Sequence, residues 1–578
     1  MNVTELSGTR MIDVLAQHLS EEGIDTVFGI PGGLLYPFFH HVERDSAFNL
    51  IVTKHEEAAA FMADGYARAS GRPAVAAATA GPGATNLITG VAAAFADGVP
   101  MVVLTGQASS FHLGKGASQE SWREDIDIVG MMRPITKYSA MVISPDHISR
   151  HFRRAMRLAT SGRPGPVHLN IPVDYWNHPV DETWFQPRTY RTVSTPVDPH
   201  AVGNACQALA AADRPVLLVG SGARSPGARQ AVRQLAEALG VPVATTPRAK
   251  GVFPEDHQLS VGIFGFAGHS SAKQAVFDPG SDLLLTIGAS LNETTTLNWD
   301  PAVTCGKVLI QVDIDPERIG RNFPIDHGIV ADAEVAARAI LNHLRATGSH
   351  DAAASRRAKP ILPAFGFNDE DLRASLAVPL APQRWRAELM HALPEDAVLV
   401  SDIGGHMLFN LHHLRLGEGN DFLLNLGFGS MGHGTTAPIG AKLARPDRPV
   451  IAIIGDACFT MNGMDLLTAR EYDIPVVWIV EDNAQHGITH HASKRLSAGR
   501  PLHCVTYRQP PDIADIASSM GLVTWRVDRP GQMSQALKEA IAANTPAVIH
   551  VTVDPEISPP VGDRVDTVAG FKGDNPPN

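Results

Sequence analysis

Short apolar runs alternate with longer amphipathic stretches along almost the whole chain. In the first part, the runs TVFGIP, NLIVTK, AVAAATA, MVVLTG and PVHLNIP each have the length of a strand, and helical patterns such as residues 57–70 separate them. Runs that are apolar throughout predict strands buried on both faces of a parallel sheet, joined by helical crossovers. The pattern therefore indicates an α/β fold.

The alternation occurs in three blocks, separated by segments near residues 177–199 and 348–380 that have little strand pattern. The second block carries PVLLVGSGAR, PVATT, LLLTIGA and VLIQVDIDP, and the third carries AVLVSDIG, FLLNLG, VIAIIGDA, VVWIVEDN, LVTWRV and AVIHVTV. Each block predicts one doubly wound parallel-sheet domain. The expected domains are residues 1–181, 195–345 and 381–556. We expect the Pro- and Gly-rich tail, residues 557–578, to be mobile or to lie over a neighbour.

Composition excludes several kinds of partner. Of the 578 residues, 44% are hydrophobic and 19% charged, so large cores can form, and the net charge of −12 comes without a basic stripe. No apolar stretch is long enough to cross a bilayer, and the N-terminal segment looks like an amphipathic helix without the apolar core of a signal peptide. Four cysteines without close pairing suit a reducing compartment. We expect a cytoplasmic protein that binds neither nucleic acid nor membrane.

Oxygen-bearing side chains follow two strands of the third block. The run from Val450 to Ile454 ends at Gly455-Asp456-Ala457-Cys458, and the run from Ile474 to Val480 ends at Glu481-Asp482-Asn483. Two parallel strands that each deliver an oxygen ligand can bind a hard cation such as Mg²⁺ together with a diphosphate. The negative diphosphate also suits the N-terminus of the helix that follows. A backbone carbonyl near Gln485 could be a third ligand. The alternative is an ordinary strand–turn–helix with an aspartate cap.

These two segments resemble the Gly-Asp-Gly…Asn-Asn signature of thiamine diphosphate enzymes, with Ala457 and Asp482 replacing the usual Gly and Asn. Further segments resemble the acetolactate synthase group (acetohydroxyacid synthase large-subunit type) in the same order along nearly the whole chain. The resemblance implies pyrimidine-binding, central and diphosphate-binding domains, with thiamine diphosphate and Mg²⁺ as cofactors. It also implies a homodimer or homotetramer, because the family's cofactor lies between the pyrimidine domain of one subunit and the diphosphate domain of another.

A second motif opens the helix after NLIVTK. Carboxylates at a helix start can simply complement the helix dipole. However, His55-Glu56-Glu57-Ala58-Ala59, followed by Ala63-Asp64-Gly65-Tyr66-Ala67-Arg68, is similar to the family's His-Glu-x-x-Ala segment and the helix after it. The resemblance gives Glu56 the carboxyl group that faces N1′ of the cofactor's aminopyrimidine. We expect Glu57 to cap the helix or to face solvent.

Several glycine-rich turns carry the rest of the resemblance. Gly81–Asn86 is similar to the Gly-Pro-Gly-x-x-Asn turn, and Gln119 matches an active-site glutamine, although Ser118 replaces the aromatic residue before it. Met431 matches the methionine that bends the cofactor, and the carbonyl of Gly429 would hold N4′. Each turn is also compatible with a plain strand–helix connection, and Met431 with a core position.

The resemblance thus implies Glu56 and Gln119 as catalytic residues, and Asp456, Asn483 and Gln485 as the residues that hold Mg²⁺. The complete set of expected cofactor contacts is Gly29, Pro31, Gly32, Glu56, Thr79, Ala80, Gly83, Asn86, Gly405, His406, Gly429, Met431, Gly455, Asp456, Ala457, Cys458, Asn483, Gln485, His486, Gly487 and Ile488.

Two departures limit the resemblance. Ala492 stands where acetohydroxyacid synthases have a Trp that selects the second keto acid, and the neighbouring His490 and His491 are expected to be surface histidines of a mobile loop, with substrate contact as the alternative. The central block has Ala289–Thr294 in place of the Arg-Phe-Asp-Asp-Arg run that holds FAD. The glycine-rich turn Gly220-Ser221-Gly222 is compatible with nucleotide binding, but we expect no FAD.

The resemblance implies an enzyme that decarboxylates a 2-keto acid and transfers the acyl anion to a second carbonyl. A simple decarboxylase is one alternative, and a non-decarboxylating lyase or a transferase similar to sulfoacetaldehyde acetyltransferase is another. A non-catalytic paralogue is a third alternative, supported only by the altered Gly-Asp-Gly motif.

Overall fold

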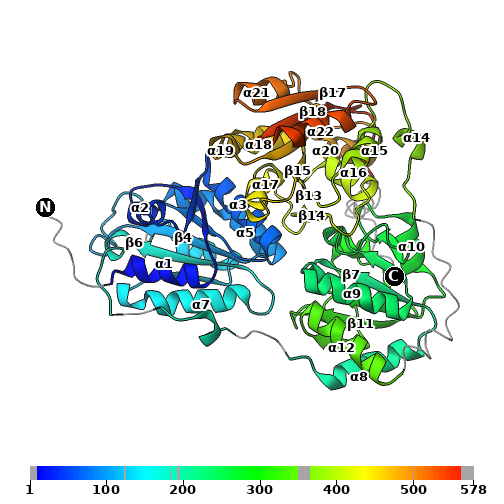
Figure 1. Cartoon of the computed structure of the whole chain (residues 1–578), viewed down its shortest axis with the longest axis horizontal. Coiled ribbons are helices and arrows are strands. Elements are labelled where there is room, and N and C mark those ends of the chain that lie inside the picture. The colour runs from blue at the N-terminus through cyan, green and yellow to red at the C-terminus, as the bar shows by residue number, and fades with distance from the viewer. Residues whose placement is uncertain are drawn as a thin grey trace.

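The computed structural model describes residues 9–122, 125–181, 184–191, 196–348, 365–497 and 499–560. Three α/β domains meet near the middle of the molecule, with the N-terminal domain at the left of Figure 1, the C-terminal domain at the top and the central domain at the lower right. Each contains a six-stranded parallel sheet, which confirms the predicted fold class. Of the predicted tail, residues 561–578 lie outside the described residues. No helix in the described ranges is long and apolar enough to cross a membrane.

The N-terminal sheet has the strand order β2-β1-β3-β4-β6-β5. Its strands are β1 (Thr26–Ile30), β2 (Asn49–Val52), β3 (Val75–Ala78), β4 (Met101–Gln107), β5 (Tyr138–Met141) and β6 (Pro166–Pro172). One face packs on α1 (Met11–Glu21), α2 (Tyr36–Arg44) and α7 (Ile148–Thr160), and the other on α3 (Glu56–Ser70) and α5 (Ile88–Asp97). Strand β5 was not predicted, because this half-buried edge strand lacks an apolar run.

The C-terminal sheet has the order β14-β13-β15-β16-β18-β17, which equals the N-terminal order when strands are counted within each domain. Its strands are β13 (Val398–Ser401), β14 (Asp421–Leu424), β15 (Val450–Gly455), β16 (Val476–Asp482), β17 (Val523–Val527) and β18 (Ala547–Thr552). One face packs on α15 (Pro382–Ala392), α16 (Gly405–His413) and α22 (Met533–Ala543), and the other on α17 (His433–Ala444), α18 (Asp456–Asn462), α19 (Leu466–Glu471) and α21 (Ile513–Ser519).

The central sheet has a different order, β12-β11-β10-β7-β8-β9. Read from β9 and counted within the domain, this is 3-2-1-4-5-6, which matches the dinucleotide-binding topology. Its strands are β7 (Pro215–Val219), β8 (Val243–Thr245), β9 (Ser260–Ile263), β10 (Leu283–Ile287), β11 (Val308–Asp313) and β12 (His327–Val330). Helices α8 (Pro199–Ala211), α9 (Pro226–Leu239) and α12 (Ala333–Ala346) cover one face, and α10 (Ser270–Phe277) covers the other.

The N- and C-terminal domains share one continuous apolar core, in which α3 packs against α17. Two glycines permit this close approach. A Cβ atom at Gly65 would lie 2.0 Å from the carbonyl oxygen of Ala437, and one at Gly440 would lie 1.8 Å from that of Met62. In the same interface His433 Nε2 lies 2.6 Å from Asp64 Oδ1. The two helices thus fix the N- and C-terminal domains against each other.

Candidate functional site

The sheet topology brings the predicted cofactor residues to two switch points. In the shared strand order, the connections after the first and third strands leave in opposite directions, and ligands of open α/β sheets bind outside the carboxyl ends at such a point. The loops after β1 and β3 carry Gly29–Gly32 and Thr79–Asn86 in the N-terminal domain. Those after β13 and β15 carry Asp402–His406 and Gly455–Cys458 in the C-terminal domain.

Glu56 lies at the N-terminal switch point, as the first residue of α3. Its Oε2 accepts a hydrogen bond from Asn86 Nδ2 at 2.9 Å, and a Cβ atom at Gly83 would lie 3.3 Å from its Oε1. The loops after β1 and β3 touch, because a Cβ atom at Gly32 would lie 2.5 Å from Thr79 Cβ. The buried Thr79 Oγ1 has no hydrogen-bond partner among the described residues. These predicted residues therefore lie together as one polar, glycine-lined wall.

Gln119 stands beside this wall in an exposed loop with a left-handed φ of 61°. Gln107 at the end of β4 holds the loop: its Oε1 accepts the N–H of Ser121 at 2.9 Å, and its Nε2 donates to the Ser121 carbonyl at 2.8 Å. Ser121 Oγ in turn accepts the N–H of Gly81 at 3.1 Å. This positioning role of Gln107 was not predicted, because it depends on a contact between distant loops.

His406 and Cys458 connect the two loops of the C-terminal switch point. A Cβ atom at Gly455 would lie 2.9 Å from His406 Nδ1, and the Cys458 thiol donates to the Ile403 carbonyl at 3.3 Å. Burial, with the nearby Arg386 guanidinium, lowers the pKa of His406 to about 3, so the imidazole is neutral. Its buried Nε2 has no partner in the described part of the chain.

Asp456 and Asp482 form a buried acidic pair at the ends of β15 and β16. Asp456 Oδ1 accepts the N–H of Ala457 at 2.7 Å, while its buried Oδ2 lacks a partner among the described residues. Burial and the charge of Asp482 raise the pKa of Asp456 well above its usual value. Burial also opposes ionisation of Asp482. Its carboxylate, however, accepts hydrogen bonds from His550 (2.9 Å) and from the Ala484 N–H (2.9 Å), and these outweigh the effect of burial, so the pKa of Asp482 is lowered.

This donor set fits Mg²⁺. A hard cation would neutralise the negative charge of the acidic pair, and the Asp456 oxygen that has no hydrogen-bond partner would coordinate it. Asn483 lies next to it, with Oδ1 accepting the Gln485 N–H at 3.2 Å, and a Cβ atom at Gly487 would lie 2.5 Å from Asn483 Nδ2. Asp456, Asn483 and the Gln485 carbonyl are therefore the residues that would hold the ion.

The loop between β14 and α17 borders the same region. Gly429 has a φ of +77°, and a Cβ atom there would meet nothing within 4 Å, so space is open beside it. Met431 packs partly buried against the shared core. Asp402 holds the loop by accepting the Gly432 N–H at 3.1 Å and the Thr435 hydroxyl at 3.1 Å. The backbone is thus unobstructed at Gly429, two residues before Met431, which is predicted to bend the cofactor.

The expectation for His490 and His491 was wrong. Both are buried in α20 (Gly487–Leu496), since this segment folds as a helix against the C-terminal sheet instead of a mobile surface loop. His491 Nε2 lies 3.0 Å from the Pro555 carbonyl, and burial lowers its pKa. Ala492 packs on the core of the sheet, and Ile488 lies beside Gly405, whose added Cβ would be 3.6 Å from the Ile488 nitrogen.

Within one chain, no hydrogen bond joins the predicted cofactor residues of the N-terminal domain to those of the C-terminal domain, as far as the described residues go. Besides the contact of α3 with α17, the two domains meet at the end of α18 and in the turn after it, where Asn462 Nδ2 donates to Glu57 Oε2 at 3.1 Å and Asp465 Oδ1 accepts the Lys54 N–H at 2.8 Å. Glu57 therefore binds the other domain, which corrects the expectation that it caps the helix or faces solvent.

Comparison with known sequences defines the class of protein. Residues 9–130 match the N-terminal TPP binding domain of thiamine pyrophosphate enzymes, residues 202–340 their central domain, and residues 402–551 their C-terminal TPP binding domain. The chain belongs to the thiamine pyrophosphate enzyme family.

Several relatives of this chain are named as acetolactate synthases. The chain is 36% identical to the "Probable acetolactate synthase large subunit" of Methanocaldococcus jannaschii, over 94% of this chain and 92% of that protein. It is 34% identical to the acetolactate synthase large subunit of Corynebacterium glutamicum, over 93% and 86%. The large subunit of acetolactate synthase isozyme 3 of Escherichia coli is 31% identical, over 95% of both chains. The protein is thus a thiamine diphosphate-dependent enzyme related to acetolactate synthases.

Proposed function

We propose that the protein decarboxylates a 2-keto acid and transfers the acyl unit to a second carbonyl compound, with thiamine diphosphate and Mg²⁺ as cofactors. The observation that carries this proposal is the similarity to acetolactate synthase large subunits along more than nine-tenths of the chain. Glu56, Asp456, Asn483 and Met431 are all present where that chemistry requires them. Their retention argues against a non-catalytic paralogue.

The proposed roles come from the resemblance to the family, and the contacts of these residues support them. Bound thiamine diphosphate supplies a ring that accepts the electron pair of the broken carbon–carbon bond. Glu56, with one carboxylate oxygen held by Asn86, would exchange a proton with N1′ of the aminopyrimidine. Asp456, Asn483 and the Gln485 carbonyl would hold Mg²⁺. Gln119 would contact the substrate from the loop that Gln107 holds.

We propose a homodimer or a homotetramer as the active assembly. The two halves of the site lie on different domains of one chain without a hydrogen bond between them in the described ranges, which favours completion by a second subunit. Coexpression of Glu56→Gln chains with Asp456→Asn chains tests this, because each mixed dimer would contain one intact site. Recovered turnover supports the shared site, whereas no recovery in verified mixed dimers contradicts it.

FAD is not part of the proposal. The crevice at the switch point of the central sheet has a volume of about 240 Å³, below the range of roughly 300–1,000 Å³ usual for ligand pockets. Its two turns close on each other, because the Gly222 N–H donates to the Gly288 carbonyl at 3.1 Å. A cytoplasmic location is part of the proposal, since all four cysteines are unpaired.

The test is CO₂ release from a panel of 2-keto acids with thiamine diphosphate and Mg²⁺, with the products identified by mass spectrometry. Release with a condensed hydroxyketone product supports the proposal, and an aldehyde product supports simple decarboxylation instead. Absence of release from every acid by the cofactor-loaded enzyme contradicts both and favours the non-decarboxylating transferase or lyase. Ala492, in place of the family's Trp, leads us to expect an acceptor other than those of branched-chain synthesis.

A further inference from the structure

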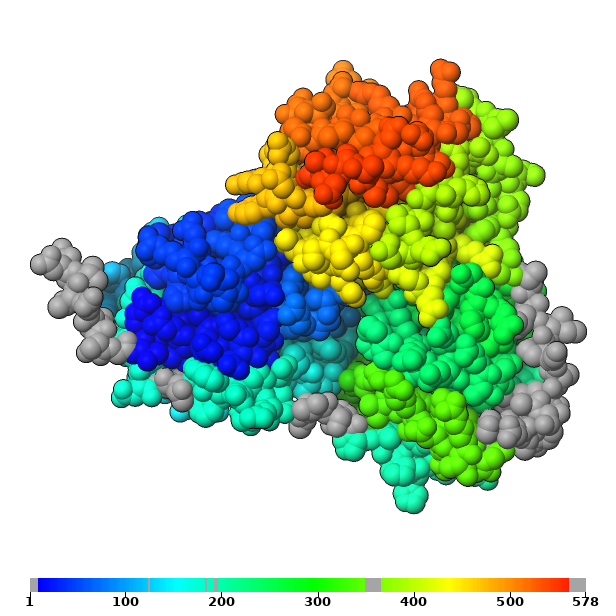
Figure 2. All heavy atoms as spheres, viewed as in Figure 1, coloured from blue at the N-terminus to red at the C-terminus, as the bar shows by residue number. Residues whose placement is uncertain are grey.

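A large cavity lies where the three domains meet, away from both switch points of the cofactor site. Its volume is about 670 Å³, and its lining comes from the end of α3 and the loop after α5, the start of α9, and the segments flanking β14 and α17. In Figure 2 the blue, green and yellow surfaces converge there. The cavity is large enough for a small metabolite.

Arginines dominate this cavity. Seven arginines line it, against three carboxylates, and no aromatic side chain is among the lining residues. The carboxylates are shared: Arg229 and Arg448 both bind Asp421, while Arg68 and Arg248 both bind Asp97. Arg233 binds Glu418, and its buried Nε lies 3.8 Å from Glu237 Oε1 without a hydrogen bond to any described residue. Among the residues that line the cavity, arginines therefore outnumber carboxylates by four, and Asp64 behind the lining also binds Arg68.

Two of these arginines bind no carboxylate in the described part of the chain. Arg224 donates only to carbonyl oxygens, those of Phe422 at 2.7 Å and Arg248 at 2.5 Å, and Arg445 donates to the Ala69 carbonyl at 2.9 Å. Burial, with the nearby Arg229 guanidinium, lowers the pKa of Arg224 to about 9. Arg224 is half-buried and feels Asp421 only at a distance, so a bound anion would compensate a guanidinium that no carboxylate contacts.

We propose that this cavity is a binding site for a small anion that bears two or more phosphate groups and no aromatic base. Guanidinium groups bind phosphate oxygens in bidentate geometry, and several converge here from different domains. The absence of an aromatic side chain from the lining leaves nothing on which a base would stack. The site is separate from the proposed reaction and does not depend on which keto acid is used.

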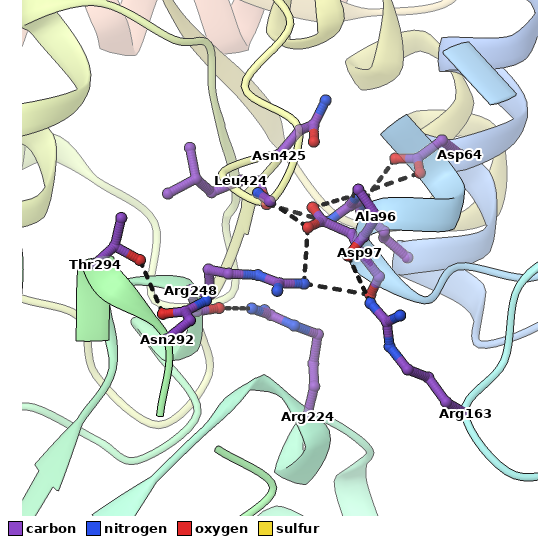
Figure 3. A network of polar contacts seen from close by, with 12 residues as sticks. Asp64, Ala96, Asp97, Arg163, Arg224, Arg248, Asn292, Thr294, Leu424 and Asn425 are labelled. Carbon is purple, nitrogen blue, oxygen red and sulfur yellow. Dashed lines mark hydrogen bonds and ion pairs between the residues drawn. The ribbon is translucent and has the colours of Figure 1, made fainter. Parts of the chain in front are cut away.

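The network around the cavity connects it to the cofactor loop. Figure 3 shows Arg163 and Arg248 directed toward Ala96 and Asp97, while Arg224 donates to the Arg248 carbonyl. Asp97 Oδ1 accepts the Gly427 N–H at 3.0 Å, in the loop that carries Gly429 and Met431, and lies 2.8 Å from Arg248 Nη2. An anion that draws Arg248 or Arg68 away from Asp97 would change the position of the Asp97 carboxylate, and with it the hydrogen bond that Asp97 accepts from the Gly427 N–H of this loop. The bound anion is therefore expected to change the affinity for thiamine diphosphate, and the effect is reciprocal.

The test is calorimetric titration of the enzyme saturated with thiamine diphosphate and Mg²⁺, using fructose 1,6-bisphosphate as the probe. Fructose, which lacks the phosphate groups, tests whether the sugar alone is bound. ADP, which carries a diphosphate and an aromatic base, tests whether a base improves binding. We expect the bisphosphate to bind and fructose not to bind. Arg224→Gln and Arg445→Gln should each weaken binding about tenfold or more. Arg338→Gln, on the exposed side of α12, pairs with Glu334 outside the cavity and should leave binding unchanged.

Three outcomes would overturn the proposal. Failure of both phosphate compounds to bind would refute the site, and equal binding to the wild type and both cavity variants would place the anion elsewhere. Binding of ADP much tighter than the bisphosphate would refute the chemical class. Because Arg224 holds two backbone carbonyls and Arg445 only one, Arg445→Gln keeps the test valid if Arg224→Gln does not fold. An unchanged dissociation constant for thiamine diphosphate with the bisphosphate bound would refute the coupling.

Discussion

The N- and C-terminal sheets have the same strand order, yet their switch points differ in charge. The C-terminal one places two carboxylates, Asp456 and Asp482, at adjacent strand ends, whereas the N-terminal one places a single carboxylate, Glu56, against the amide of Asn86. A cation with a diphosphate suits the first environment, and a neutral nitrogen ring suits the second. Topology therefore decides where a ligand can bind, and the side chains at the strand ends decide which part of it binds.

The central sheet adds a third case. It also has a switch point with glycine turns, but a Cβ atom at Gly220 would lie 2.0 Å from the Gly288 carbonyl oxygen. The two turns thus fill the space into which a ligand would fit. A glycine-rich turn after a strand is consequently weak evidence for nucleotide binding unless the neighbouring loop leaves space for a ligand beside the turn.

Asp456→Asn should have the largest effect, because it removes a metal ligand from the charged switch point. Turnover should fall at least about 1,000-fold, since metal stabilisation contributes several kcal/mol. The metal-free protein should not lose stability, because Asp456 is buried with an unpaired oxygen and a raised pKa. Steady-state kinetics and thermal unfolding with and without Mg²⁺ measure both effects. Near-normal turnover in the variant would show that the metal binds elsewhere.

Glu56→Gln tests the neutral switch point. We expect thiamine diphosphate to bind with little change while turnover falls about 100-fold or more, as is usual when a proton-transfer group is removed. Glu57→Gln is the matched control: it is the next residue of α3 but contacts Asn462 of the other domain, so turnover should change only a few-fold. Equal losses in the two variants would mean that Glu56 acts through domain packing.

The predictable part of this structure is local. Apolar runs identified all six strands of the C-terminal sheet, but β5, β9 and β12 were missed, since these edge strands lack a distinct apolar run. The burial of His490, the contact of Glu57 with Asn462 and the holding role of Gln107 were not predictable. Each depends on which distant segment packs beside it, and no motif in one sequence encodes that. The arginine cavity was missed for the same reason, because its lining comes from three domains.

Gly65→Ala should destabilise the contact between the two similar domains. The added methyl would lie 2.0 Å from the Ala437 carbonyl, so α3 and α17 would have to separate. We expect a loss of about 1–3 kcal/mol in the free energy of unfolding, the usual cost of overpacking. Gly33→Ala is the control, since a Cβ atom there meets nothing within 4 Å. Equal stability of the two variants, measured by urea unfolding, would contradict the close helix crossing.

The last and smallest expected effect compares the histidines of the two equivalent strands. His168 of β6 is fully buried between the hydroxyl groups of Thr105 (2.7 Å) and Ser139 (2.9 Å), whereas His550 of β18 lies against the Asp482 carboxylate. Burial lowers the pKa of His168 to about 3. The unfolded chain therefore binds a proton below its ordinary pKa of about 6.5 that the folded chain does not bind.

Its contribution to stability is complete above pH 6.5 and is lost as the pH falls toward 3. Between pH 6 and pH 4 the folded state should lose up to about 1.4 kcal/mol per pH unit through this residue. Other buried histidines add to the slope, so the readout is the difference between the wild type and His168→Asn, which keeps a polar side chain but does not titrate. Urea unfolding at several pH values should give a shallower pH dependence for the variant. Parallel pH profiles would show that His168 takes up a proton in the folded state, so that the hydroxyl-lined position in β6 would tolerate a charged imidazole.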